Sequence, residues 1–345
     1  MKYNKLANTN ISISEICLGT MTFGEQNNEY EGHQQLDFAL ENGVNFIDTA
    51  ELYSVPSRTE TYGSTETIIG SWLRKTGNRN KVVLASKIAG PGDYTAHIRN
   101  TGYSKHAITE ALHNSLKRLQ TSYLDLYQLH WPTRVTNYFG VRNYTHSKKN
   151  EQEDNFLSIL ETLNDFVIEG KIRHLGISNE TAWGTMKFLS EAEKHNLPRL
   201  KTIQNPYSLL NRTYEGALAE ISMQEKIGLL AYSPLAFGVL SGKYRNGNSP
   251  NNSRITLFPR FDRYSNEQST KAVDLYHELA RKNGLSLTEL SLAFVRQQPW
   301  VSSTIIGATT MNQLKENIAT ADITLPPDII AEINQINELI PNPAP

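Results

Sequence analysis

Four side chains in the first part of the chain could together protonate a carbonyl oxygen: Asp48, Tyr53, Lys87 and His130. A tyrosine has a pKa of about 10 and is a poor proton donor at neutral pH, but a neighbouring ammonium group lowers that pKa. We expect Lys87 to supply the ammonium group and Asp48 to hold it in its charged form. A neutral His130 would hydrogen-bond the oxygen as negative charge develops on it.

The polar groups stand at the ends of short apolar runs. Six runs end in this way, at Asp48, Lys87, His130, Asn179, Gln204 and Tyr232. If the runs are strands of one parallel barrel, their carboxyl ends meet at one mouth and residues remote in sequence become neighbours. Singly, each residue has an ordinary structural explanation, such as a turn cap or a hydrogen-bonded core histidine. The set at consecutive strand ends favours a functional site, since packing needs none of these polar groups.

Strand-like and helix-like segments alternate along the chain. The first two strand-like runs are ISEICLGTM and NFIDTA, and the last two are IGLLAYSP and SSTIIGA. In the segments between successive runs, apolar residues recur with helical spacing. Eight such units predict an α/β fold, a closed (β/α)8 TIM barrel, with residues 1–345 as a single domain. KYNKLANTNISIS predicts an N-terminal β-hairpin that closes the barrel floor, and PPDIIAEINQINELI predicts a C-terminal helix.

Two long insertions follow predicted strands, at residues 132–153 and 241–266. Loops after strands line the face on which barrel enzymes bind substrate, so we expect both insertions near the site. Four aromatic residues are expected to shape a mouth for carbonyl compounds with apolar bodies: Phe23, Trp131, Tyr138 and Phe139. The same aromatic side chains could equally pack the loops themselves.

Composition narrows the classes of partner. A formal net charge of -1 and the absence of a long basic run give no electrostatic argument for nucleic acid or an anionic membrane as the main partner. No apolar stretch is long enough to cross a bilayer, and MKYNKLANTN lacks the apolar segment of a signal peptide, so we expect a cytoplasmic protein. The one cysteine, Cys17, lies in an apolar run, which predicts a buried thiol, no intrachain disulfide and no cysteine metal site. Monomer and homo-oligomer both stay open.

The chain resembles the aldo-keto reductase superfamily in a series of motifs, which in chain order are FIDTAELY, LASKI, LDLYQLHWP, GISN, IQNPYSLL, LLAYSPLAFGVLSGKY and IIGATTMNQLKEN. Within the superfamily it is most similar to the Tas-type NADP(H)-dependent reductases, near the branch of the potassium-channel β-subunits. The resemblance implies reduction of an aldehyde or ketone to an alcohol by hydride transfer from NADPH, which becomes NADP+. It also implies that Tyr53 is the general acid and that Asp48, Lys87 and His130 complete a catalytic tetrad.

The resemblance further implies a set of cofactor-binding residues in the second half of the chain. For the nicotinamide they are Ser178, Asn179, Gln204 and Tyr232; for the pyrophosphate, Ser233, Leu235, Gly238, Ser241, Lys243 and Arg254; and for the adenosine end, Gly307, Thr309, Gln313, Glu316 and Asn317. Small residues let backbone amides approach the anion, and the cations neutralise it. Arg260 and Arg263 follow in the same insertion, where ordinary solvated basic side chains are also expected.

Two segments depart from the common pattern of the superfamily. Many carbonyl-reducing members carry a lysine and an arginine where this chain has Gly307 and Gln313, and the choice of NADPH over NADH rests on the nearer branch, which shares the uncharged residues. The segment SVPSRTETYGSTE after Tyr53 is longer than usual and similar to the Tas-type form.

Two other functions stay open. The first is an NADPH-binding regulatory or sensor subunit with slow turnover, as in the channel-associated relatives. The second is a barrel isomerase or lyase that acts on a phosphorylated metabolite through a Schiff base on Lys87. Asp48 beside the lysine argues against the second, because it keeps the amine protonated.

Overall fold

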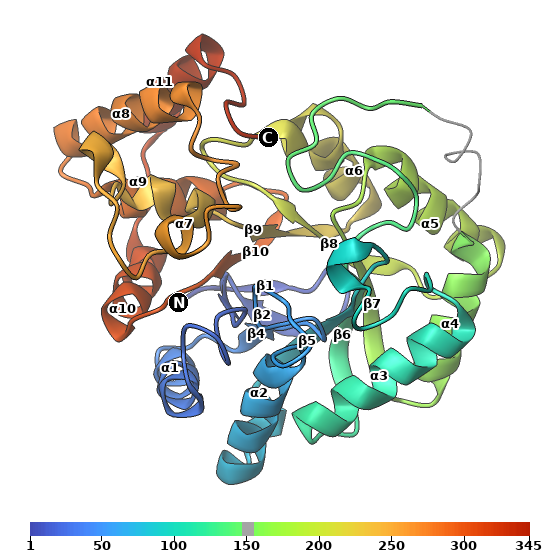
Figure 1. Ribbon diagram of the computed structural model, residues 1–345. Helices are drawn as coiled ribbons and strands as arrows, with labels where there is room; N and C mark the ends of the chain where they lie inside the picture. The colour runs from blue at the N-terminus through green and yellow to red at the C-terminus, as the bar shows by residue number, and fades with distance from the viewer. Residues whose placement is uncertain (147–154) are drawn as a thin grey trace.

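Eight parallel strands close into a barrel in a computed structural model that describes residues 1–146 and 155–345 (Figure 1). The strands are β3 (Ile16–Gly19), β4 (Phe46–Asp48), β5 (Val83–Ile88), β6 (Leu124–Leu129), β7 (Ile172–Ser178), β8 (Leu200–Pro206), β9 (Gly228–Tyr232) and β10 (Val301–Ile306). Each pairs with its neighbours in the chain, and β10 pairs with β3 to complete the ring. The predicted (β/α)8 barrel is confirmed, and each strand lies on the apolar run that predicted it.

Helices surround the barrel, as Figure 1 shows. Eight lie on predicted segments: α1 (Glu29–Glu41), α2 (Ser64–Thr76), α3 (Lys105–Leu119), α4 (Phe156–Ile168), α5 (Ala182–Lys194), α6 (Leu218–Glu225), α8 (Glu267–Lys282) and α10 (Met311–Ala319). Several begin at a polar side chain that accepts a hydrogen bond from the first turn, such as Asn28 before α1 and Ser104 before α3. The predicted C-terminal helix is also present, as α11 (Pro327–Leu339).

Two helices were not predicted, the short α7 (Arg254–Leu257) and the longer α9 (Leu287–Arg296). Helix α9 starts at a capping box in which Ser286 and Glu289 satisfy each other's backbone N–H groups. Nearly all of its residues are buried. The buried residues include the polar side chains of Thr288, Ser291 and Arg296.

An N-terminal hairpin of β1 (Tyr3–Lys5) and β2 (Ser12–Ser14) closes one end of the barrel, as predicted. Its side chains Leu6 and Ile13 are fully buried and pack with Cys17, Phe46 and Val83. Phe46 is the first residue of β4 and Val83 is the first residue of β5, so the hairpin lies at the end where the barrel strands begin. The prediction of a buried Cys17 is confirmed, and burial raises the pKa of its thiol well above the usual value.

The insertions follow strands β6 and β9. The second carries α7 and a short 3-10 turn at Arg245–Gly247, whereas residues 147–153 of the first lie outside the described part of the chain. Among the helices that the structure describes, none combines the length and apolarity needed to cross a membrane. The same residues contain no group of three or more His, Cys, Asp or Glu side chains placed to hold a metal ion.

Candidate active site

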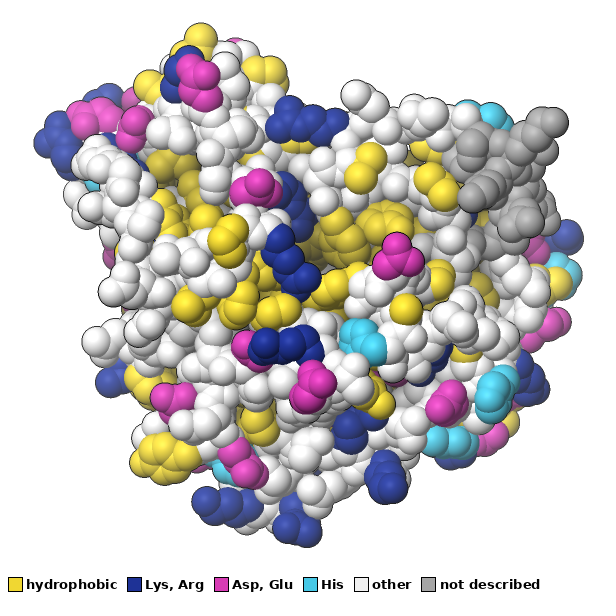
Figure 2. Space-filling view, in the orientation of Figure 1, with side chains coloured by type: hydrophobic (Ala, Val, Ile, Leu, Met, Phe, Trp, Pro, Cys, Tyr) yellow, Lys and Arg dark blue, Asp and Glu magenta, His cyan; other side chains and the backbone are white. Residues whose placement is uncertain are grey.

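A cavity of about 850 Å³ opens at the carboxyl ends of the barrel strands. Figure 2 shows hydrophobic side chains in the depth of a hollow on this face, with Lys and Arg side chains crossing it. Asp48, Tyr53 and His130 line the wall, whereas Lys87 is fully buried behind it. The predicted cofactor-binding residues all line the same cavity: Ser178, Asn179, Gln204, Tyr232, Ser233, Leu235, Gly238, Ser241, Lys243, Arg254, Gly307, Thr309, Gln313, Glu316 and Asn317.

The four predicted tetrad residues lie together. Nζ of Lys87 donates to Oδ2 of Asp48 at 2.6 Å and to the carbonyl oxygen of Thr49 at 2.8 Å. The same nitrogen lies 5.0 Å from the centroid of the Tyr53 ring. The rings of Tyr53 and His130 meet edge to face with their centroids 5.7 Å apart. An acid, an ammonium group, a phenol and an imidazole are therefore within reach of one another.

The loop after β4 is fixed to the loop after β5 by a buried carboxylate. Oε1 of Glu51 accepts a hydrogen bond from the backbone N–H of Ala89 at 2.6 Å, and the carboxylate forms an ion pair with Arg99. Burial raises the pKa of Glu51, and the nearby Arg99 opposes that rise. Because Tyr53 comes two residues later and its N–H donates to the carbonyl oxygen of Ala50, this clamp also sets the place of the phenol.

A network inside the barrel holds the second carboxylate oxygen of Asp48. Oδ1 accepts from Nε2 of Gln204 at 2.9 Å and from Nε2 of Gln128 at 3.3 Å. Both oxygens of this buried acid are thus hydrogen-bonded, as a buried charge requires. Sequence reasoning missed Gln128, although a polar amide inside the mostly apolar strand LDLYQL was a usable signal.

The residues predicted to face the nicotinamide are held by one another. Nδ2 of Asn179 donates to the carbonyl oxygen of His130 at 2.9 Å, and its Oδ1 accepts from the hydroxyl of Tyr232 at 2.6 Å. Oγ of Ser178 donates to the carbonyl oxygen of Gln204 at 2.7 Å. Asn179 has a φ of 54°, in the left-handed region that asparagine adopts more readily than most residues. The amide and hydroxyl groups are therefore preorganised at the inner end of the cavity.

Burial governs the protonation of Tyr53 and His130. It raises the pKa of the Tyr53 phenol well above its ordinary value, and the carboxylate of Asp48 adds to the rise. Burial and the ammonium group of Lys87 lower the pKa of His130 well below its ordinary value, so the imidazole is neutral. The expectation of a neutral His130 agrees with the structure. The expectation that Lys87 brings the pKa of Tyr53 down is wrong for this geometry, because the cost of desolvating a phenolate is larger.

A basic region follows β9. Residues 233–243 form a loop with positive φ at Ser233, Phe237 and Gly238. Gly238 has a φ of 91°, a conformation that favours glycine, and Lys243 packs over it, with Cε 2.6 Å from where a Cβ would lie. Within the described ranges no carboxylate pairs with Lys243 or Arg254, and burial lowers the pKa of both. Two desolvated cations without a protein counter-charge fit an anionic ligand such as a pyrophosphate.

The remaining predicted residues surround the start of α10. Oε1 of Gln313 accepts from the N–H of Thr309 at 2.9 Å, and Nδ2 of Asn317 donates to the carbonyl oxygen of Gly307 at 3.2 Å. A Cβ added to Gly307 would meet nothing within 4 Å, so the backbone here faces open space. Free N–H groups and the dipole at a helix N-terminus favour negative charge, which suits a phosphate at this end of the cavity.

The mouth is aromatic, with one correction. Trp131, Tyr138 and Phe139 line the cavity as expected, and the centroids of Trp131 and Phe139 lie 5.6 Å apart. Phe23, however, is fully buried under α1 and α2, where it packs closely on Gly32. Its carbonyl oxygen accepts from Oγ1 of Thr65, which turns this segment into the core.

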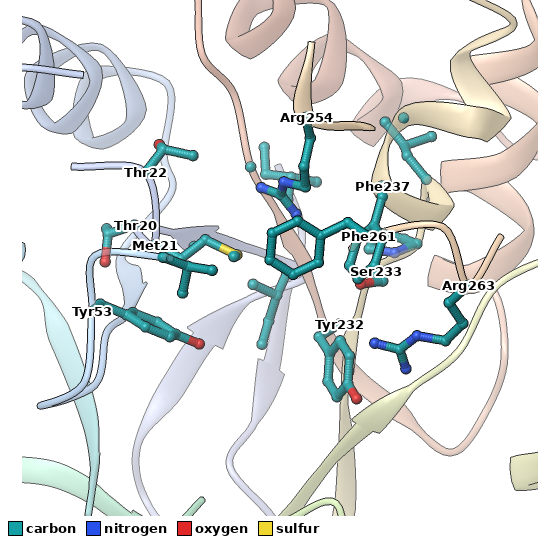
Figure 3. A pocket seen from close by; sticks show the side chains of 18 of the residues that line it. Thr20, Met21, Thr22, Tyr53, Tyr232, Ser233, Phe237, Arg254, Phe261 and Arg263 are labelled. Carbon is teal, nitrogen blue, oxygen red and sulfur yellow. The ribbon is translucent and has the colours of Figure 1, made fainter. Parts of the chain in front are cut away.

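Several lining residues were missed because apolar and small residues in loops carry no distinctive signal. They include Thr20, Met21, Thr22, Tyr94, Phe237 and Phe261. Figure 3 shows Tyr53 and Met21 on one side of the cavity, with Tyr232, Arg254 and Phe261 across from them.

Comparisons with known proteins agree with this geometry. Residues 15–338 match the family described as "Aldo/keto reductase family". The chain is 51% identical to Protein tas of Escherichia coli over 347 residues, which covers 100% of both chains. It is 33% identical to the uncharacterized oxidoreductase YrpG of Bacillus subtilis, over 99% of this chain and 97% of that one. It is 29% identical to a probable voltage-gated potassium channel subunit beta of rice, over 97% of this chain and 96% of that one. The chain therefore belongs to the aldo/keto reductase family, whose oxidoreductases generally use NAD(P)H and act on small-molecule carbonyl substrates.

Proposed function

We propose that the protein is a single-domain, cytoplasmic NADPH-dependent reductase that converts aldehydes or ketones into alcohols. The observation that carries the proposal is the meeting of Tyr53, His130 and the Lys87–Asp48 pair at one wall of a cavity that the expected cofactor residues also line. Bound NADPH would supply the hydride, held at its nicotinamide end by Ser178, Asn179, Gln204 and Tyr232 and at its pyrophosphate by Lys243 and Arg254.

The protein's part in the reaction is to place and protonate the carbonyl oxygen. Tyr53 donates its hydroxyl proton to that oxygen as hydride reaches the carbon, and the neutral imidazole of His130 orients the oxygen by a hydrogen bond. The phenolate left behind faces the ammonium group of Lys87, which Asp48 holds in place. A proton from solvent then restores the phenol, so the reaction consumes one proton for each carbonyl reduced.

The high pKa of Tyr53 predicts how the rate depends on pH. The phenol stays protonated well above neutral pH, so kcat for carbonyl reduction is expected to be nearly constant from neutral to mildly alkaline pH. Alcohol oxidation needs the phenolate as base, and its kcat should rise with pH over the same interval. Steady-state rates in both directions across this range test the assignment. A fall in reduction near neutral pH would contradict it.

The basic region predicts a salt-sensitive cofactor site. Lys243→Met and Arg254→Gln should each weaken NADPH binding by about tenfold or more at low salt, because a buried charge-assisted contact to a phosphate is lost. Fluorescence titration measures the Kd, and added salt should narrow the difference from the parent protein. Lys271→Met is a matched control, since Lys271 pairs with Glu267 on the exposed face of α8. If Lys243→Met and Arg254→Gln bind NADPH with unchanged affinity, this loop does not bind the pyrophosphate.

A panel of aldehydes and ketones, followed by cofactor absorbance with NADPH and NADH in parallel, tests the reductase activity and the cofactor choice together. Turnover with NADPH well above that with NADH supports the proposal. Because Gly307 and Gln313 offer no cation to a 2′-phosphate, equal turnover with both cofactors would mean that this end of the site does not discriminate.

A regulatory subunit is a second candidate, favoured by the likeness to a probable potassium channel subunit beta over almost the whole chain. Tightly held NADPH with very slow turnover across the panel would support it. The Schiff-base lyase is not favoured, because the ammonium group of Lys87 is fully buried and already donates to Asp48 and Thr49. Covalent trapping of Lys87 with borohydride would restore that alternative.

A further inference from the structure

Two arginines of the loop after β9 line the cavity but have no part in the function proposed above: Arg260 and Arg263. Neither forms an ion pair with a carboxylate in the portion of the chain that the structure describes. Nη1 of Arg263 is buried and has no hydrogen-bond partner among those residues. A buried guanidinium N–H without an acceptor costs free energy, which an anionic ligand would offset.

Arg263 and Arg254 both lie over the Phe237 ring, with their Cζ atoms 5.2 and 5.3 Å from its centroid, and Arg263 also reaches the loop that carries the aromatic mouth. Figure 3 shows its guanidinium next to Tyr232 and apart from the Arg254 side chain. Its Cδ is 3.0 Å from where a Cβ on Gly140 would lie, so the arginine stem packs against the loop after β6. Gly140 directly follows the mouth residue Phe139. Arg263 therefore reaches the part of the cavity where a substrate would extend.

Arg260 reaches the opposite part of the same mouth. Its Nη2 donates to the hydroxyl of Tyr94, in the loop after β5, at 3.3 Å, and its Cζ lies 5.0 Å from the centroid of that ring. Lys243, by contrast, packs on Gly238 inside the loop expected to hold the pyrophosphate. Arg260 and Arg263 thus reach the loops after β5 and β6, which border the mouth, in addition to lining the cavity.

Aromatic rings fix the direction of the Arg263 side chain. Its Cζ lies 5.2 Å from the centroid of Phe237 and 5.3 Å from that of Tyr264. These contacts hold the planar guanidinium without neutralising its charge. Asp93 and Asp262 also line the cavity, but neither comes within ion-pair distance of Arg263. A planar cation with a free N–H at an apolar mouth matches a carboxylate in both charge and shape.

We propose that the substrate is a carbonyl compound that also carries a carboxylate, and that Arg263 binds this carboxylate while the carbonyl group faces Tyr53. The inference rests on the reductase function proposed above and names its class of substrate. The apolar carbon chain between the two groups would lie along Trp131 and Phe139, which line the cavity and contact each other.

The test compares unbranched ω-oxo carboxylates of increasing chain length with their methyl esters, which keep the carbonyl and lose the charge. With NADPH, kcat/KM of the parent protein should favour the acid of the best length over its ester by about tenfold or more. Arg263→Gln should remove this preference by raising KM for the acid, and Arg263→Lys should restore part of it. Esters should be reduced by Arg263→Gln at nearly the parent rate, and its Kd for NADPH should not change.

Arg281→Gln is the matched control, because Arg281 pairs with Glu278 on the exposed surface of α8. Equal kcat/KM for acids and esters in the parent protein would overturn the inference, as would a loss of NADPH affinity or an equal loss for acid and ester in Arg263→Gln. If the parent protein reduces neither acid nor ester, the reductase proposal fails instead. Calorimetry with ω-hydroxy carboxylates then decides: binding that requires Arg263 supports the carboxylate site, and no binding overturns it.

Discussion

Replacing Tyr53 with phenylalanine is expected to lower kcat for carbonyl reduction by about 10²- to 10⁴-fold, the range typical of a lost general acid. The phenyl ring keeps the packing of Tyr53 on His130, so the cavity should keep its shape. Because Tyr53 is not among the groups assigned to the cofactor, Kd for NADPH should stay within about twofold of the parent value. Stopped-flow and steady-state measurements of NADPH oxidation give kcat, and fluorescence titration gives Kd.

The control for this variant is Tyr30→Phe, which removes a phenol hydroxyl from an exposed position on α1. It should match the parent protein in both quantities. A Tyr53→Phe protein that reduces carbonyls at the parent rate would show that another group delivers the proton. Loss of NADPH binding in the same protein would instead place Tyr53 in the cofactor site.

Replacing Lys87 with methionine is expected to affect both stability and rate. The change leaves the Asp48 carboxylate buried without its cation, and breaking a buried ion pair in this way typically costs about 3–5 kcal/mol. The free energy of unfolding, measured by urea denaturation, should fall by an amount of that order. The rate of carbonyl reduction should also fall, because the phenolate formed at Tyr53 would face an apolar side chain.

The double variant Asp48→Asn with Lys87→Met separates these two effects. It removes both charges, and the asparagine can still accept from Gln204 and Gln128, so much of the lost stability should return. The rate should stay low, since no ammonium group stands near the phenol. Recovery of the rate together with the stability would mean that Lys87 has a structural role only.

The sequence predicted the barrel and the meeting of these polar side chains at one rim, for a physical reason. In a closed parallel barrel the strand ends share one rim, so a polar residue that ends an apolar run must lie near the others. Asp48, Lys87 and His130 met this rule, and Tyr53 was near them because it follows closely after the end of β4 and Glu51 clamps that part of the loop. Helix α9 was not predicted, although the capping box of Ser286 and Glu289 was a usable signal of its start.

What the sequence could not give depends on distances and on burial. The sequence alone does not show that burial raises the pKa of the Tyr53 phenol well above its ordinary value. Nor does it show that Phe23 turns into the core while Trp131 faces the cavity. Arg254 and Arg263 belong to one insertion, and the sequence does not distinguish their roles, yet their side chains extend to different places in the cavity. These differences follow from loop paths that no local pattern determines.

The N-terminal hairpin has a consequence for how the molecule could be altered. Leu6 and Ile13 cover the barrel core at the end where the strands begin, so this end of the interior is shielded from solvent by residues far from the rim loops. The rim loops can therefore be lengthened, shortened or given new side chains without any change to the N-terminal hairpin. Truncating Leu6 or Ile13 would have the opposite effect. It would expose Phe46 and Cys17 to solvent and destabilise the barrel while every group at the rim is unchanged.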